Sequence, residues 1–139
     1  MIPVTTPQDL SFRTAKPLTI VVADDVEEIT FLAKQWLEDA GHTVICAAGG
    51  DEVVRLMRDR KIDLVITDVL MPDGDGLDVL LAAKRMSPET KILAISGGGK
   101  YMTAGECLRI AKGIGANQVL LKPFNRVQLV AEVERLGTA

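Results

Sequence analysis

Five short apolar segments, rich in β-branched residues, alternate along the chain with stretches whose apolar residues recur at helical spacing. The apolar segments predict strands over 18–23, 43–47, 64–67, 91–95 and 118–121. The stretches between and after them predict helices over 29–40, 51–60, 76–86, somewhere within 100–112, and over 126–136. Helical crossovers join parallel strands with a single hand. The sequence therefore predicts one α/β domain, a doubly wound five-stranded parallel sheet with helices on both faces.

The boundaries of the domain and of two helices carry their own signals. Segment 1–17 contains three prolines and no periodic pattern, so we expect an N-terminal arm there and a single folded domain over 18–139. The length of 139 residues fits one domain of the usual size. Gly41 is well placed to end the first helix. Asn125 is predicted to cap the last helix, with Gln128 completing a capping box.

Several single residues carry predictions about packing. We expect Trp36 and Phe124 to belong to the core, and the lone His42, which follows a glycine, to face solvent. Cys46 and Cys107 lack the spacing of metal ligands, so both are predicted to be buried small hydrophobic residues.

Charge and hydropathy exclude several classes of function. The 16 basic and 19 acidic residues give a net charge of -3, which offers no general attraction to nucleic acid or to an anionic membrane. No apolar run approaches the ~20 residues that span a bilayer, and the first residues lack the apolar core of a secretory signal. We therefore expect a cytoplasmic protein that binds neither nucleic acid nor membrane.

Polar residues with distinct chemistry end four of the five predicted strands. Asp24 and Asp25 end the first strand, Asp68 the third and Ser96 the fourth, and Lys122 follows the fifth. In an open parallel sheet, functional groups lie beyond the carboxyl ends of the strands. The sequence therefore predicts that three carboxylates, a hydroxyl and an ammonium meet at one edge of the sheet.

Such a cluster predicts phosphoryl chemistry with a divalent cation. Neighbouring carboxylates stay ionised together only when a cation compensates them, and Mg²⁺ prefers hard oxygen ligands. Asp25 and Asp68 are predicted to bind Mg²⁺ directly and Asp24 through water. With Lys122 neutralising its other side, Asp68 can attack phosphorus and form an acyl phosphate. Ser96 would donate a hydrogen bond to one phosphoryl oxygen, while Lys122 pairs with another.

From about Leu18 to the C-terminus, the chain resembles the receiver domains of bacterial response regulators. The matching motifs are VVADD, LVITDVLMPDGDGL, ILAISG and GANQVLLKPF. The resemblance implies a flavodoxin-like strand order 2-1-3-4-5 and a phosphoryl group accepted by Asp68 from a histidine kinase. It also implies a Mg²⁺ site of Asp24, Asp25 and Asp68, completed by the backbone carbonyl of Leu70, and a cis peptide before Pro123.

The resemblance also implies a set of partners. A sensor histidine kinase or a histidine phosphotransfer protein would supply the phosphoryl group, and a downstream protein would bind the altered surface. The face of the fourth helix, fifth strand and fifth helix is where a homodimer interface would form. We expect a stand-alone signalling domain that dephosphorylates slowly by itself and is not an enzyme.

Two features depart from the family pattern. Val119 stands where the family usually has an aromatic ring, three residues before the lysine, and valine has too little area and too few rotamers to swing as that ring does. The segment between Ser96 and Lys122 is about one helical turn longer than usual and begins with three glycines. We therefore hypothesise that segment 97–112 performs the switching by backbone movement.

Two other functions remain as alternatives. A degenerate receiver would dock a kinase or scaffold without being phosphorylated, although the complete set of acids, hydroxyl and lysine argues against it. A phosphatase with an aspartyl-phosphate intermediate would want an acid-base aspartate two residues after the nucleophile. Val26 and Leu70 occupy those positions, after Asp24 and Asp68.

Overall fold

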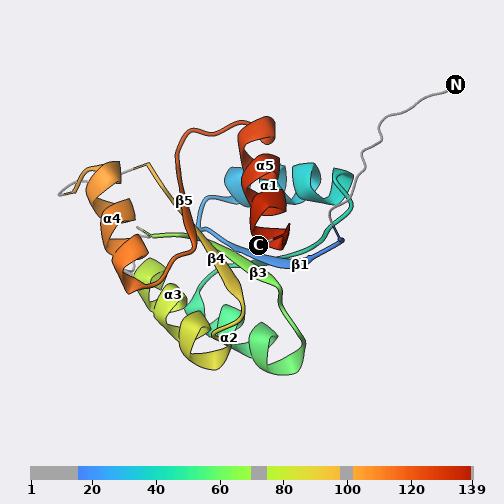
Figure 1. Ribbon diagram of the computed structural model, residues 1–139, viewed down its shortest axis with the longest axis horizontal. Helices are drawn as coiled ribbons and strands as arrows, with labels where there is room; N and C mark the ends of the chain where they lie inside the picture. Colours follow the sequence, from blue (N-terminus) through green and yellow to red (C-terminus); the bar gives the residue numbers. More distant parts are fainter. Residues whose placement is uncertain (1–15, 70–74, 98–101, 139) are drawn as a thin grey trace, which may run out of the picture.

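The structure is a computed structural model that describes residues 16–69, 75–97 and 102–138. The predicted arm over 1–17 falls almost wholly outside these residues, as do Leu70 and most of the glycine-rich stretch after Ser96. Strands and helices alternate along the described chain (Figure 1). Their order is β1 (Thr19–Ala23), α1 (Glu27–Asp39), β2 (Thr43–Ala47), α2 (Gly50–Asp59), β3 (Leu64–Asp68), α3 (Asp75–Met86), β4 (Lys91–Ser96), α4 (Ala104–Ile114), β5 (Gln118–Leu121) and α5 (Arg126–Thr138).

The five strands form one parallel sheet in the order β2-β1-β3-β4-β5, which confirms the predicted topology. β1 lies beside both β2 and β3, so that Val21 aligns with Ile45 on one side and with Val65 on the other. β2 and β5 are the edge strands. Because every strand runs in the same direction, the residues that end the strands lie at one edge of the sheet.

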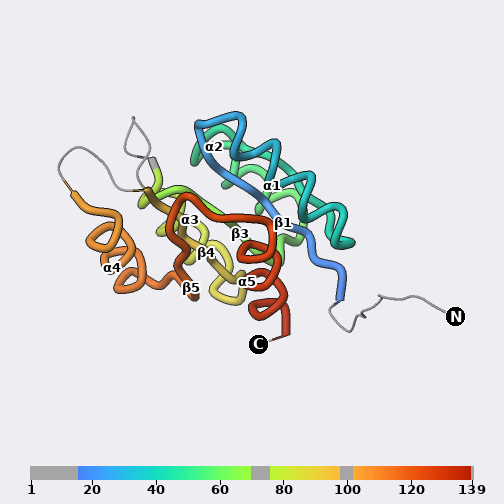
Figure 2. Tube along the Cα trace, turned by 90° about the horizontal axis from the view of Figure 1, so that it is seen from above, coloured from blue at the N-terminus to red at the C-terminus, as the bar shows by residue number. Residues whose placement is uncertain are grey.

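Each face of the sheet packs against its own layer of helices, because side chains alternate between the faces along every strand. In β1, Ile20 and Val22 contact the layer of α1 and α5, whereas Val21 and Ala23 contact α2, α3 and α4. All four side chains are fully buried. Figure 2 shows the chain from above, with α4 at the end of the molecule opposite to α1.

Hydrogen-bonding side chains begin the last two helices. Asn125 and Gln128 form the predicted capping box, since each side chain accepts from the other's backbone N–H, at 2.9 and 2.8 Å. A second capping box, not predicted above, begins α4, where Thr103 and Glu106 exchange the same two bonds. Its signal was the spacing Thr-x-x-Glu. Gly41 follows α1 with φ of 101°, as expected of the residue that ends a helix.

Two predictions about burial are wrong. His42 does not face solvent: it is 6% exposed, and its Nδ1 accepts the backbone N–H of Leu18 at 3.0 Å. Cys107 is buried as expected, but Cys46 lies exposed on the edge strand β2. Trp36 and Phe124, predicted as core residues, are partly buried and pack against the layer of α1 and α5.

Candidate functional site

The carboxyl edge of the sheet brings together the polar residues that the sequence placed at strand ends. Asp68 is the last residue of β3 and Ser96 the last of β4. Lys122 follows β5 directly, and its backbone N–H donates to the Ser96 carbonyl at 2.9 Å. Asp24, Asp68 and Ser96 are buried, whereas Asp25 is exposed. The site therefore has two buried carboxylates, those of Asp24 and Asp68, and solvent reaches it at Asp25.

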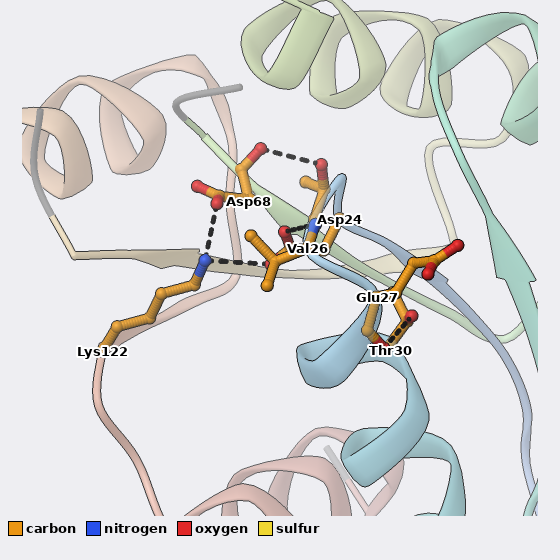
Figure 3. Close-up of polar contacts among 7 residues, drawn as sticks. Asp24, Val26, Glu27, Thr30, Asp68 and Lys122 are labelled. Atoms are coloured by element: carbon orange, nitrogen blue, oxygen red, sulfur yellow. Dashed lines mark hydrogen bonds and ion pairs between the residues drawn. The ribbon is translucent and has the colours of Figure 1, made fainter. Parts of the chain in front are cut away.

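Lys122 is the cation of this site in the structure. Its Nζ donates to Asp68 Oδ2 at 2.7 Å and lies 3.0 Å from Asp24 Oδ2 (Figure 3). The Lys122 side chain is 18% exposed, and those of Asp24 and Asp68 are almost completely buried. One ammonium thus compensates two buried carboxylates, one directly after β1 and one at the end of β3.

This contact with two acids keeps Lys122 protonated. Burial by itself lowers the pKa of Lys122, but the hydrogen bonds and the negative charges of Asp68 and Asp24 outweigh burial and raise the pKa above the ordinary lysine value. A raised lysine pKa stabilises the fold fully at neutral pH. That stability is lost only as pH rises through the folded-state pKa.

The loop after β1 holds Asp24 in place. Asp24 Oδ1 accepts the backbone N–H of Val26 at 2.9 Å, while Asp24 Oδ2 faces Lys122 (Figure 3). The N-cap of α1 is Val26, and no side chain forms a capping bond there. Asp24 therefore does not cap the helix, and its second oxygen points into the acidic cluster.

The acidic cluster fits a hard divalent cation. One carboxylate oxygen from each of Asp24, Asp25 and Asp68 lies within 4.8 Å of the others. Mg²⁺ is bound by carboxylate oxygens together with waters and phosphate oxygens, and the exposure of Asp25 leaves room for these. When bound there, Mg²⁺ would neutralise charge on phosphoryl oxygens. The Leu70 carbonyl, predicted as a further ligand, lies outside the described residues.

Two glycines, Gly76 and the first of the three glycines after Ser96, let the backbone approach this site closely. A Cβ at Gly76, in the first turn of α3, would overlap the Asp68 carbonyl oxygen and the Val69 carbonyl group. A Cβ at Gly97 would lie 3.2 Å from the Cβ of Lys122. Helix α3 therefore packs directly on the backbone of Asp68, and the stem of Lys122 lies close beside Gly97.

The sequence model of the protein family described as the response regulator receiver domain matches residues 20–134 of this chain. The chain belongs to the response-regulator receiver family. The cis peptide between Lys122 and Pro123, predicted from this resemblance, is present in the structure.

Curated relatives of this receiver are transcriptional regulators and response regulators. The chain is 38% identical over 117 residues to a protein named DNA-binding transcriptional regulator NtrC from Azospirillum brasilense, and 35% identical over 117 residues to the transcriptional regulatory protein CpxR of Escherichia coli. Each alignment covers 84% of this chain, but 24% and 48% of the respective relative. The chain thus spans about a quarter of the length of the first relative and about half of the length of the second.

Two solved structures share the fold of this receiver over nearly their whole length. The receiver domain of NtrX from Brucella abortus superposes with a TM-score of 0.79 at 31% identity, covering 86% of this chain and 98% of that one. A response regulator from Thermotoga maritima gives a TM-score of 0.78 at 26% identity, covering 89% and 100%. These matches agree with the strand order and the two helical layers described above.

Proposed function

We propose that Asp68 accepts a phosphoryl group in a Mg²⁺-dependent reaction. The observation that carries this proposal is the 2.7 Å contact between Lys122 Nζ and Asp68 Oδ2, in a buried site that Asp24 and Asp25 share. The contact supplies a carboxylate nucleophile with an ammonium beside it, and the other two acids supply oxygen ligands. Phosphoryl transfer needs positioning and charge neutralisation more than covalent help from the protein.

Each residue has a defined part in the proposed reaction. An oxygen of Asp68 attacks phosphorus, and the bond between phosphorus and the donor's leaving atom breaks. Lys122 remains protonated and turns its N–H groups toward the phosphoryl oxygens, while the Ser96 hydroxyl donates to another of them. Asp24 and Asp25, with Asp68, would hold the metal. Water later hydrolyses the acyl phosphate, which makes the receiver a slowly resetting phosphoprotein and not an enzyme.

The proposed partners follow from this chemistry. A histidine kinase or a histidine phosphotransfer protein would donate the phosphoryl group, because phosphohistidine is a high-energy donor that a carboxylate can attack. A downstream protein would bind the surface that phosphorylation changes. We extend the proposal to a domain over 18–139 that acts in the cytoplasm without itself binding nucleic acid. Within the described residues, none of the helices is long and apolar enough to span a membrane.

Intact-mass measurement tests the proposal. The native chain and Asp68→Asn are each incubated with acetyl phosphate and Mg²⁺, and the masses are followed over time. We expect a labile adduct with the mass of one phosphoryl group on the native chain and no such adduct on Asp68→Asn. When Mg²⁺ is chelated before acetyl phosphate is added, the native chain should not form the adduct either. The asparagine keeps the shape of the side chain but has no anionic oxygen with which to attack.

The same measurement separates the alternatives. An absence of phosphoryl adduct on either chain would overturn the proposal in favour of a phosphorylation-independent docking module. Sustained release of phosphate without accumulation of an adduct would indicate a phosphatase. An adduct that persists in Asp68→Asn would place the acceptor elsewhere.

We further propose that helix α4 transmits the phosphorylated state. Val119 stands where the family usually has an aromatic ring. It is half-buried and packs against the core cluster that includes Cys107, Leu108 and Ala111 of α4. A packed valine has no alternative rotamer of comparable reach. A change at Ser96 would therefore move the backbone of α4 instead of flipping a ring.

Backbone amide NMR shifts after addition of beryllofluoride and Mg²⁺ test the role of α4. We expect the amides of Ala104–Ile114 to shift, whereas those of α2, on the other side of α3, keep their positions. Unchanged shifts throughout α4, in a sample whose Asp68 amide does respond, would contradict the proposal.

A further inference from the structure

The single histidine of the chain joins the start of β1 to the turn after α1. His42 Nδ1 accepts the backbone N–H of Leu18 at 3.0 Å, and the Leu18 carbonyl accepts the N–H of Thr43 at 2.9 Å. The backbone N–H of His42 donates to the Leu37 carbonyl, at the end of α1, at 3.0 Å. The imidazole is therefore held from both sides, and it links segments that lie 24 residues apart.

The His42 ring takes the place of a backbone acceptor between β1 and β2. The hydrogen bonds of a parallel pair are evenly spaced, so a residue that accepts from Thr43 would regularly donate to the carbonyl of residue 41. Gly41 instead ends α1 with φ of 101°. Leu18 and His42 are 8% and 6% exposed, so the ring satisfies a donor that water reaches poorly.

This contact requires a neutral ring. An imidazole nitrogen that accepts a hydrogen bond carries a lone pair and no proton, whereas both nitrogens of an imidazolium are donors. Protonation of His42 would therefore turn its Nδ1–H against the Leu18 N–H and break the bond. Burial opposes the positive charge as well. The folded chain thus accommodates His42 with its proton on Nε2.

Charged side chains occur on the elements around His42. The end of α5 also belongs to these surroundings, because a Cβ at Gly137 would lie 3.0 Å from Leu18 Cδ1. The charged residues are Lys16 before β1, Glu38 and Asp39 in α1, Asp63 before β3, and Glu134 and Arg135 in α5. Asp63 accepts the Thr19 N–H at 2.8 Å, and Arg135 pairs with Glu132 at 3.0 Å. Whatever their charge, they do not restore the acceptor that the ring itself loses on protonation.

We propose that His42 is a pH-sensitive switch that weakens the attachment of β1 in mildly acidic solution. In the unfolded chain a histidine takes up a proton near its ordinary pKa of about 6.5, but the folded chain must break the bond to Leu18 to do so. Below this pH the unfolded state binds more protons than the folded state, so stability falls as pH falls. The contribution is complete at neutral pH and above.

The switch is independent of the proposed phosphorylation. His42 lies beside the start of β1, whereas Asp24 follows the end of that strand. Neither the metal nor the acceptor Asp68 takes part in the contact between His42 and Leu18. The pH dependence should therefore be the same in the native chain and in Asp68→Asn.

Urea unfolding of the full chain at a series of pH values tests this inference. The matched variant is His42→Asn, whose amide oxygen can accept the Leu18 N–H from a position close to that of Nδ1 but takes up no proton. Between about pH 7.5 and about pH 5, the unfolding equilibrium constant of the native chain should rise up to about thirtyfold more than that of the variant, the proton uptake of one ordinary histidine. Carboxylates titrate alike in both chains, so the comparison removes their effect.

Nitrogen-15 NMR of the His42 ring gives a second measurement that needs no variant. The chain has one histidine, so the ring signals need no assignment between residues. In the folded native chain, we expect a ring protonated on Nε2 alone, both at neutral pH and at about one pH unit below the ordinary histidine pKa of about 6.5.

Two results would overturn the inference. One is an equal pH dependence of unfolding in the native chain and a folded His42→Asn. The other is a ring that becomes imidazolium at the ordinary histidine pKa while the Leu18 amide keeps its chemical shift. If the variant does not fold, the ring signals of the native chain decide.

Discussion

Replacing Gly76 with alanine is expected to destabilise the domain by about 3 kcal/mol, the upper range for forcing an extra methyl group into a packed site. A Cβ there would overlap the Asp68 carbonyl oxygen and the Val69 carbonyl group. Neither carbonyl group can turn away as a flexible side chain can, since Asp68 ends the buried strand β3 and Val69 follows it directly. Chemical unfolding should show the loss of stability, and the yield of phosphoryl adduct should fall because the backbone of the acceptor must shift.

Gly113→Ala is the matched control, since it changes the same residue type inside another helix. Gly113 lies in α4, and nothing lies within 4 Å of a Cβ built on it. Alanine is favoured over glycine in a helix interior by about 1 kcal/mol, so this variant should be more stable than the native chain. If the two variants lost stability equally, the close approach of α3 to Asp68 would not explain the effect at Gly76.

The sequence was sufficient to predict the fold because its three central strands, β1, β3 and β4, are buried on both faces. Such strands read as continuous apolar segments that contrast sharply with the amphipathic helices between them. In β3, for example, all five residues from Leu64 to Asp68 are buried. Even the polar end of the segment was informative, because an aspartate that follows a buried strand must lie at the carboxyl edge of the sheet.

Predictions failed where burial depends on a contact between distant segments. His42 is buried because its Nδ1 receives the backbone N–H of Leu18, 24 residues earlier. A buried N–H needs an acceptor, but the sequence does not say which side chain supplies it. Cys46 is exposed because β2 is an edge strand, and the position of a strand within the sheet is a property of the topology and not of the strand's own residues.

The members of the candidate site were predictable, but their geometry was not. Strand ends located Asp24, Asp68 and Lys122, because parallel strands carry their last residues to one edge. The sequence predicts Lys122 on one side of Asp68 and the metal on the other. In the structure, Lys122 also contacts Asp24 at 3.0 Å. The reach of a flexible lysine depends on the space around its stem, here beside Gly97, which no sequence pattern specifies.

Replacing Lys122 with methionine is expected to tighten Mg²⁺ binding by about tenfold, which corresponds to about 1.4 kcal/mol. The ammonium lies 2.7 and 3.0 Å from oxygens of two predicted metal ligands, so it repels a divalent cation and competes for the same carboxylates. Methionine keeps most of the apolar stem and removes the charge. Titration calorimetry measures the affinity, and the yield of phosphoryl adduct should fall although the metal binds more tightly, because the ammonium no longer neutralises the phosphoryl oxygens.

Lys122→Met should also lower the stability of the domain, because Asp24 and Asp68 lose the cation that compensates them. Removing one partner of a buried ion pair leaves an uncompensated charge and costs about 3 kcal/mol. Without metal, Lys122→Met should therefore unfold at a lower temperature than the native chain, and added Mg²⁺ should restore more of its stability than it adds to the native chain. Lys112, whose Nζ donates to the carbonyl of Asn117 just before β5, lies at the opposite end of the sheet, so Lys112→Met removes an equal charge and should leave the Mg²⁺ affinity unchanged. Equal Mg²⁺ affinities in the native chain and Lys122→Met would mean that the ammonium and the metal do not share these acids.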